Sequence, residues 1–84
     1  MTGHHRTLPI LARICDRIDE LFIEEVGPFG QLVAAESRET WLAAGSQVRT
    51  SDVRNYINLL AKEIPESGRR EAFVFRADVH LGLI

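Results

Sequence analysis

The chain has 84 residues, of which 45% are hydrophobic and 26% are charged, and its net charge is −2 at pH 7. This length makes one domain with a thin core, and the composition is that of a globular protein and excludes a disordered chain. The negative charge argues against nucleic acid as the obvious partner, because phosphate binding depends on Lys and Arg. Cys15 is the only cysteine, so no disulfide can form within one chain.

The sequence lacks the signals of a membrane or secreted protein. No run approaches the roughly 18 apolar residues that a membrane span needs, and the first residues lack the apolar segment of a signal peptide. Lys62 is the only lysine among 10 basic residues, a usage that we attribute to a GC-rich genome. We expect a cytoplasmic, bacterial protein with no membrane association, and one unpaired cysteine fits a reducing compartment.

The first element is an amphipathic helix. Residues 1–7 are polar and without periodicity, so they are expected to be a mobile tail before a single helical domain over residues 8–84. The helix begins near Leu8 or Pro9 and ends near Val26. Its apolar residues recur at steps of three and four, namely Leu11, Ile14, Cys15, Ile18, Leu21 and Phe22.

A Gly-Pro junction separates the first helix from the second. Gly27 is a natural terminator that is expected to need a positive φ, and Pro28 suits the first turn of a new helix. The second helix is predicted from Pro28 through Ala44, with Gly45 as its cap. Its apolar residues are Phe29, Leu32, Val33, Ala35 and Trp41.

A third helix follows the connection over residues 46–49. The run Thr50-Ser51-Asp52 contains good N-caps, and an acid there favours the positive end of the helix dipole. Apolar residues then follow at helical spacing until Pro65 stops the helix, namely Val53, Tyr56, Ile57, Leu60 and Ile64.

The last segment fits two patterns. Ser67 can cap a helix that runs through about Arg76, with Phe73, Ala77 and Leu81 on one face. The residues Phe73, Phe75, Ala77, Val79, Leu81 and Leu83 also alternate with polar ones, as in a strand. We favour the helix and leave residues 77–84 open. The predicted fold is all-α, a compact bundle of three or four short helices with a C-terminal tail of undetermined structure.

No set of residues predicts catalysis, a cofactor or a metal. The adjacent His4 and His5 lack further ligands at fixed spacing, and the neighbouring Glu24 and Glu25 point about 100° apart on a helix. Cys15 lies on an apolar stripe, where a buried inert thiol is expected. A protein-interaction or oligomerisation module, with a protein partner or a second copy as a homodimer, is therefore favoured over an enzyme.

Large apolar side chains are the candidates for such an interface. Trp41 fits a core position at helical spacing and fits an interface anchor equally well, because large aromatics carry much of the binding energy at interfaces. The C-terminal segment supplies the other candidates. The full set is Trp41, Phe73, Phe75, Val79, Leu81 and Leu83.

An alternative function is DNA binding by the third helix. Polar and basic residues gather at its start, after a helix and a short connection, as in a helix-turn-helix recognition helix. The candidate DNA-contacting residues are Arg49, Ser51, Arg54 and Asn55.

Several short motifs occur in a recognisable order, namely Val26-Gly27-Pro28, Leu32-Val33, Leu59-Leu60-Ala61, Ile64-Pro65 and Arg70-x-x-Phe73. Together they resemble a short all-helical domain of bacterial signalling proteins, found C-terminal to Ser/Thr kinase or receiver domains. The resemblance covers roughly residues 18–75. It implies a helical architecture and a signalling or regulatory setting, and it assigns no activity.

Overall fold

The computed structural model describes residues 9–45 and 49–82. The described chain forms four helices, α1 (Pro9–Val26), α2 (Gly30–Ala43), α3 (Thr50–Ala61) and α4 (Ser67–Leu81). The predicted all-α bundle is therefore confirmed. The tail predicted over residues 1–7 lies outside the described residues.

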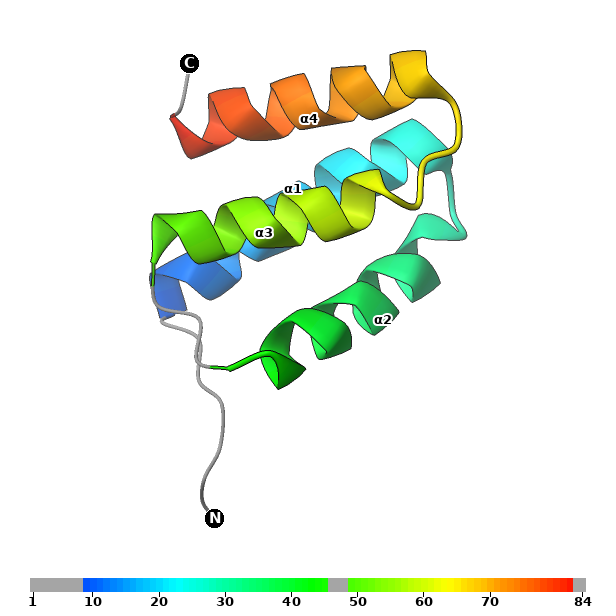
Figure 1. Ribbon diagram of the computed structural model, residues 1–84. Helices are drawn as coiled ribbons and strands as arrows, with labels where there is room; N and C mark the ends of the chain where they lie inside the picture. The colour runs from blue at the N-terminus through cyan, green and yellow to red at the C-terminus, as the bar shows by residue number, and fades with distance from the viewer. Residues whose placement is uncertain (1–8, 46–48, 83–84) are drawn as a thin grey trace.

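The helices are arranged in three layers (Figure 1). The middle layer contains α1 and α3, which pack on each other, while α2 covers one side of this pair and α4 covers the other. Both outer helices contact α1 and α3, and within the described residues they do not contact each other. Each outer helix therefore has one face toward the middle layer and one face toward solvent.

The core lies between these layers and contains residues from all four helices. Two aromatic pairs cross it, since Phe22 of α1 packs edge-on against Phe73 of α4, and Trp41 of α2 packs against Tyr56 of α3. The buried hydrophobic residues are Leu11, Cys15, Ile18, Leu21, Phe22, Ala34, Trp41, Val53, Tyr56, Ile57, Leu60, Ala61, Ile64, Phe73 and Ala77.

The first helix agrees closely with its sequence pattern. Five of the six predicted apolar positions are buried, and Ile14 packs partly buried against them. The helix ends at Val26, and the amide of Gly27 donates to the carbonyl of Ile23 at 2.7 Å. Gly27 has φ +94°, which confirms the expected left-handed conformation that side chains disfavour.

The second helix differs from its prediction in the residue at which it begins and in the residues that it turns toward the core. It begins at Gly30, because Pro28 and Phe29 form the turn that follows α1. A Cβ on Gly30 would lie only 2.8 Å from Cγ2 of Val26, so this glycine lets α2 approach the end of α1. Gly30, Ala34 and Trp41 are the buried residues of α2. Of the five apolar residues named for this helix, Trp41 is buried and Val33 is partly buried, whereas Phe29, Leu32 and Ala35 are exposed because small residues occupy the close contact with α1.

The third helix begins at Thr50, with Arg49 as the N-cap residue. The carboxylate of Asp52 accepts a hydrogen bond from the amide of Arg49 at 2.8 Å, so Asp52 stabilises the helix start from inside the first turn. The helix ends at Ala61, earlier than predicted. Ile64 is buried nonetheless, in the turn that precedes Pro65.

The last segment is helical from Ser67 to Leu81, beyond the predicted end near Arg76. The strand alternative is therefore wrong for the described residues of this segment, and Leu83 lies outside them. Phe73 and Ala77 face the core as the helical pattern predicts, and Leu81 packs partly buried against it.

Candidate protein-interaction surface

A polar network links the three helices α1, α2 and α3 inside the bundle. The hydroxyl of Tyr56, whose ring is fully buried, donates a short hydrogen bond to Asp19. Arg38 Nη2 lies 2.7 Å from the other oxygen of Asp19 and 3.2 Å from Asp16, and its guanidinium stacks over the Tyr56 ring. These contacts tie the three helices together, although the buried Nε of Arg38 has no hydrogen-bond partner within the described residues.

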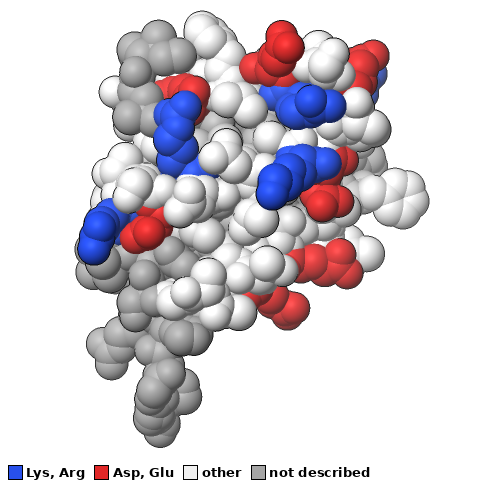
Figure 2. Space-filling view, viewed as in Figure 1, with Lys and Arg blue, Asp and Glu red and all other residues white. Residues whose placement is uncertain are grey.

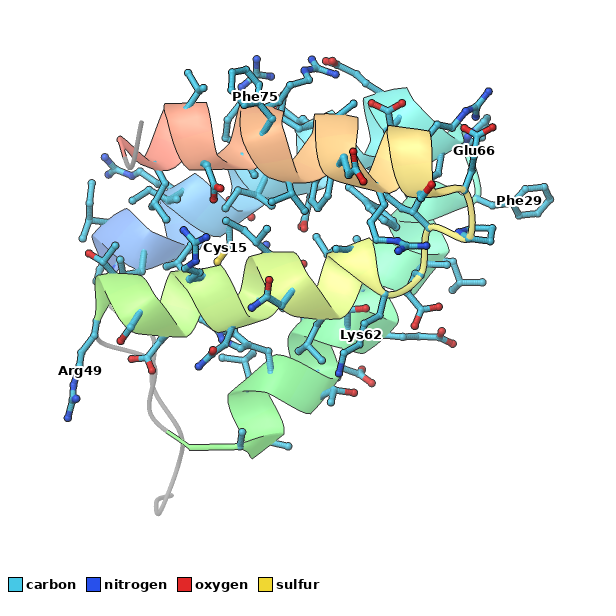
Figure 3. All side chains as sticks on the ribbon, turned by 45° about the horizontal axis from the view of Figure 1, so that its top comes forward. Cys15, Phe29, Arg49, Lys62, Glu66 and Phe75 are labelled. Atoms are coloured by element: carbon cyan, nitrogen blue, oxygen red, sulfur yellow. The ribbon has the colours of Figure 1, made fainter. Side chains whose placement is uncertain are left out.

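Burial shifts the pKa values of several ionisable groups in and beside this network. Burial raises the pKa of Asp19, although its hydrogen bonds with Tyr56 and Arg38 oppose the shift. Burial also raises the pKa of Tyr56 and brings that of Cys15 to about 12. Figure 3 shows Cys15 in the interior of the bundle. A fully buried, protonated thiol is a poor nucleophile at neutral pH.

No group of three or more His, Cys, Asp or Glu side chains that could hold a metal ion occurs in residues 9–45 and 49–82. His4 and His5 lie outside this part of the chain. Within the same residues, every helix is too short or too polar to cross a membrane.

An elongated apolar surface lies along α4. Gly68, Ala72, Phe75 and Val79 follow one another at steps of four, three and four residues, and all four are exposed. Phe75 retains 57% of its accessible surface and Val79 retains 48%. We call these four residues the α4 stripe. Figure 3 shows Phe75 on the outer side of α4, and the stripe lies opposite the core face of this helix, which carries Phe73 and Ala77.

Charged residues of opposite sign border the α4 stripe. On the side of α1, Arg76 forms ion pairs with Glu24 at 2.5 Å and Glu25 at 3.9 Å. On the side of α3, Asp78 pairs with Arg54 at 3.3 Å. Positions 69 and 76 share the first border and positions 71 and 78 share the second, because residues seven apart lie on the same side of a helix. On α4 itself the first border carries arginines and the second carries acids, and Arg69, Arg76 and Asp78 are each already paired within the chain.

Two grooves flank α4. A shallow one of about 330 Å³ lies between α1 and α4, and Leu21, Phe75 and Val79 give it an apolar lining beside Arg17 and Arg76. A larger one of about 1050 Å³ runs over α3 between α2 and α4 and mixes apolar and polar side chains, including Asn55, Asn58 and Leu59. The smaller groove adjoins the α4 stripe and extends its apolar surface.

A second apolar surface lies at the corner between α1 and α2. Phe29 retains 84% and Leu32 retains 64% of the accessible surface. Figure 3 shows Phe29 projecting from the bundle. This corner is a local protrusion, whereas the α4 stripe spans most of a helix.

The candidate interface residues separate into four groups. Trp41 and Phe73 are core residues, and Trp41 Nε1 donates to the carbonyl of Asp52 at 2.7 Å, so neither is available at the surface as an anchor. Phe75 and Val79 are exposed, and Leu81 is partly buried. Leu83 lies outside the described residues. Gly68 and Ala72 were missed as candidates, although their spacing to Phe75 and Val79 was visible in the sequence.

The candidate DNA-contacting residues are all exposed near the start of α3. They are Arg49, Ser51, Arg54 and Asn55. Figure 3 shows Arg49 extending from this end of the helix. On the face shown in Figure 2, basic side chains of the described residues are interspersed with acidic ones, and Arg54 is paired with Asp78.

Residues 13–81 match a family described as a domain of unknown function, DUF8082. The chain belongs to this family. The match includes all of α2 and α3, the α4 stripe and most of α1. No curated protein and no solved structure matches the chain.

Proposed function

We propose that this DUF8082 domain is a non-enzymatic protein-interaction module that binds its partner through the α4 stripe. The observation that carries the proposal is the second apolar face of α4. Phe73 and Ala77 already provide this helix with a core face, so packing of the domain itself does not require Phe75 and Val79 to be apolar.

Physical reasoning connects such a face to binding. Single exposed hydrophobic residues are common on protein surfaces. A contiguous stripe is different, because removing apolar surface from water is favourable by about 25 cal/mol per square ångström, which opposes the entropy cost of association. An aromatic residue at the centre of such a stripe is the usual energetic anchor of an interface. Phe75 has this position in the α4 stripe.

The proposal also includes a cellular context. The order of motifs from Val26-Gly27-Pro28 to Arg70-x-x-Phe73 resembles a domain of bacterial signalling proteins. We therefore place the module in a bacterial, cytoplasmic signalling or regulatory assembly. A DNA-binding role for α3 has less support, since Arg54 is neutralised by Asp78 and the chain as a whole is acidic.

In-cell photo-crosslinking tests the proposal. A photoreactive amino acid at position 79 is expected to form covalent adducts with a specific protein, which mass spectrometry of the adduct identifies. The matched control carries the same amino acid in place of Glu39, which is exposed on α2. Equal or absent labelling at the two positions would show that the α4 stripe is not a binding surface.

A further inference from the structure

We infer that the partner of the α4 stripe is a second copy of this chain, bound with the two α4 helices side by side and parallel. This inference rests on the proposed function and specifies its partner. It begins with the spacing of Gly68, Ala72, Phe75 and Val79, which is the spacing of the contact positions in a two-helix coiled coil. A partner helix with the same spacing can pack along it.

The charges at the borders of the stripe favour a second copy whose α4 runs parallel to the first. The basic border of α4 contains Arg69 and Arg76, and the acidic border contains Glu71 and Asp78. Asp78 is buried and paired with Arg54, so Glu71 is the acid that a partner helix would meet. In a parallel pair, each border faces the opposite border of the partner helix, whereas in an antiparallel pair each border faces its own copy. Parallel pairing therefore places an acidic border beside a basic border twice, whereas antiparallel pairing places borders of like charge together.

Glu71 is the residue that this pairing would engage. It is exposed, and within the described residues it forms no ion pair. A two-fold axis along α4 places Glu71 of one copy near Arg76 of the other, five residues further along the partner helix. Arg76 is already paired with Glu24 and Glu25, so this contact contributes to orientation more than to affinity.

The shape of the stripe and the position of α4 permit the contact. Gly68 has open space around it, and small residues at positions 68 and 72 let two helices approach closely. Phe75 and Val79 of both copies then pack against each other. Because α4 is an outer layer with α1 and α3 on its inner side, the two bundles lie on opposite sides of the paired helices (Figure 1).

The expected dimer is reversible. A single helix pair with four contact residues in each copy buries less than the roughly 800 Å² per partner of a standard stable interface. We therefore expect a dissociation constant above about 1 μM.

Sedimentation equilibrium over a range of protein concentrations provides the first test. The wild-type chain is expected to shift from monomer to dimer as its concentration rises. A Phe75→Asp/Val79→Asp variant is expected to stay monomeric with unchanged helical content by circular dichroism. The matched control is Phe29→Asp, which places an acid at an even more exposed aromatic position and is expected to leave dimerisation intact.

Disulfide formation tests the direction of the helices. In a Cys15→Ala background, a Val79→Cys thiol is expected to form an intermolecular disulfide under mild oxidation, because parallel pairing brings position 79 of both copies together. In an antiparallel pair with residue 79 opposite residue 68, the two thiols would be about 16 Å apart along the helix axis. A wild-type dimer without this disulfide would overturn the parallel arrangement.

The two proposals fail in different ways. If the wild-type chain is monomeric at high concentration and position 79 forms an adduct with a different protein, the partner is not a second copy. The proposal of an interaction module is then still supported. Absence of dimer and of adducts would overturn both. Self-adducts and the disulfide together would support both.

Discussion

The contact between α1 and α2 at Gly30 gives a quantitative prediction. In a Gly30→Ala variant the new Cβ would lie 2.8 Å from Val26 Cγ2 and 3.1 Å from the backbone Cα of Ile23. Val26 has a stiff branched side chain and the Ile23 atom belongs to a helix backbone, so the helices must separate. Such overpacking typically costs about 1–3 kcal/mol, while replacing Gly in a helix by Ala recovers about 0.5–1 kcal/mol.

The net loss of unfolding free energy is therefore about 1–2 kcal/mol. For a domain of this size, each kcal/mol lowers the melting temperature by about 4–8 °C. Urea denaturation followed by the fluorescence of the buried Trp41 measures the loss. A Gly30→Ala variant as stable as the wild type would refute the close contact between α1 and α2.

A double-mutant cycle identifies the cause of the loss. Val26→Ala removes the nearest atom, so Gly30→Ala is expected to cost about 0.5–1 kcal/mol less in that background. Gly27→Ala serves as the control, since its φ of +94° makes the substitution costly while its surroundings are open. Its cost of about 1–2 kcal/mol should not fall when Val26 is shortened. Equal relief at both glycines would point to a general loosening of the corner.

Three further predictions concern single side chains. The pKa of Cys15 is about 12 in the fold against 9.0 for a free thiol, so only the unfolded chain ionises between these values and stability falls with rising pH. We expect a slope of about 1.4 kcal/mol per pH unit from this thiol in urea titrations, and a Cys15→Ala variant that keeps the same slope would contradict it. Tyr56→Phe removes the hydrogen bond to Asp19 and is expected to cost about 1.5–3 kcal/mol in the same assay. Phe29→Ser, at the exposed corner, is expected to change the unfolding free energy by less than about 0.5 kcal/mol, and a larger loss would show that Phe29 packs in the fold.

The sequence predicted the parts of the fold that depend on local spacing. In α1, four large apolar residues and Cys15 form the buried face, so the periodicity identified both the helix and the side that it turns to the core. In α2 the pattern misled, because Gly30 and Ala34 form the close contact and small residues give a weak hydrophobic signal. The apolar residues that the sequence offered for this helix include Phe29 and Leu32, which face solvent.

The polar network could not be read from local spacing at all. Asp19, Arg38 and Tyr56 come from three helices, and each alone looks like an ordinary surface residue or core aromatic. Only the packing of α1, α2 and α3 brings a carboxylate, a guanidinium and a hydroxyl together. The ion pair of Arg54 with Asp78 is equally long-range, and it weakens the case for DNA binding that the sequence of α3 alone suggested.

The ambiguity of the last segment has a physical origin that bears on function. Alternating apolar residues from Phe73 onward are typical of a strand with one buried face. In this helix the alternation arises because Phe73 and Ala77 face the core while Phe75 and Val79 face solvent. A helix that only completes its own bundle needs one apolar face. The pattern that made the secondary structure ambiguous is therefore the sequence signature of a helix with two apolar faces, and we propose that the exposed one binds a partner.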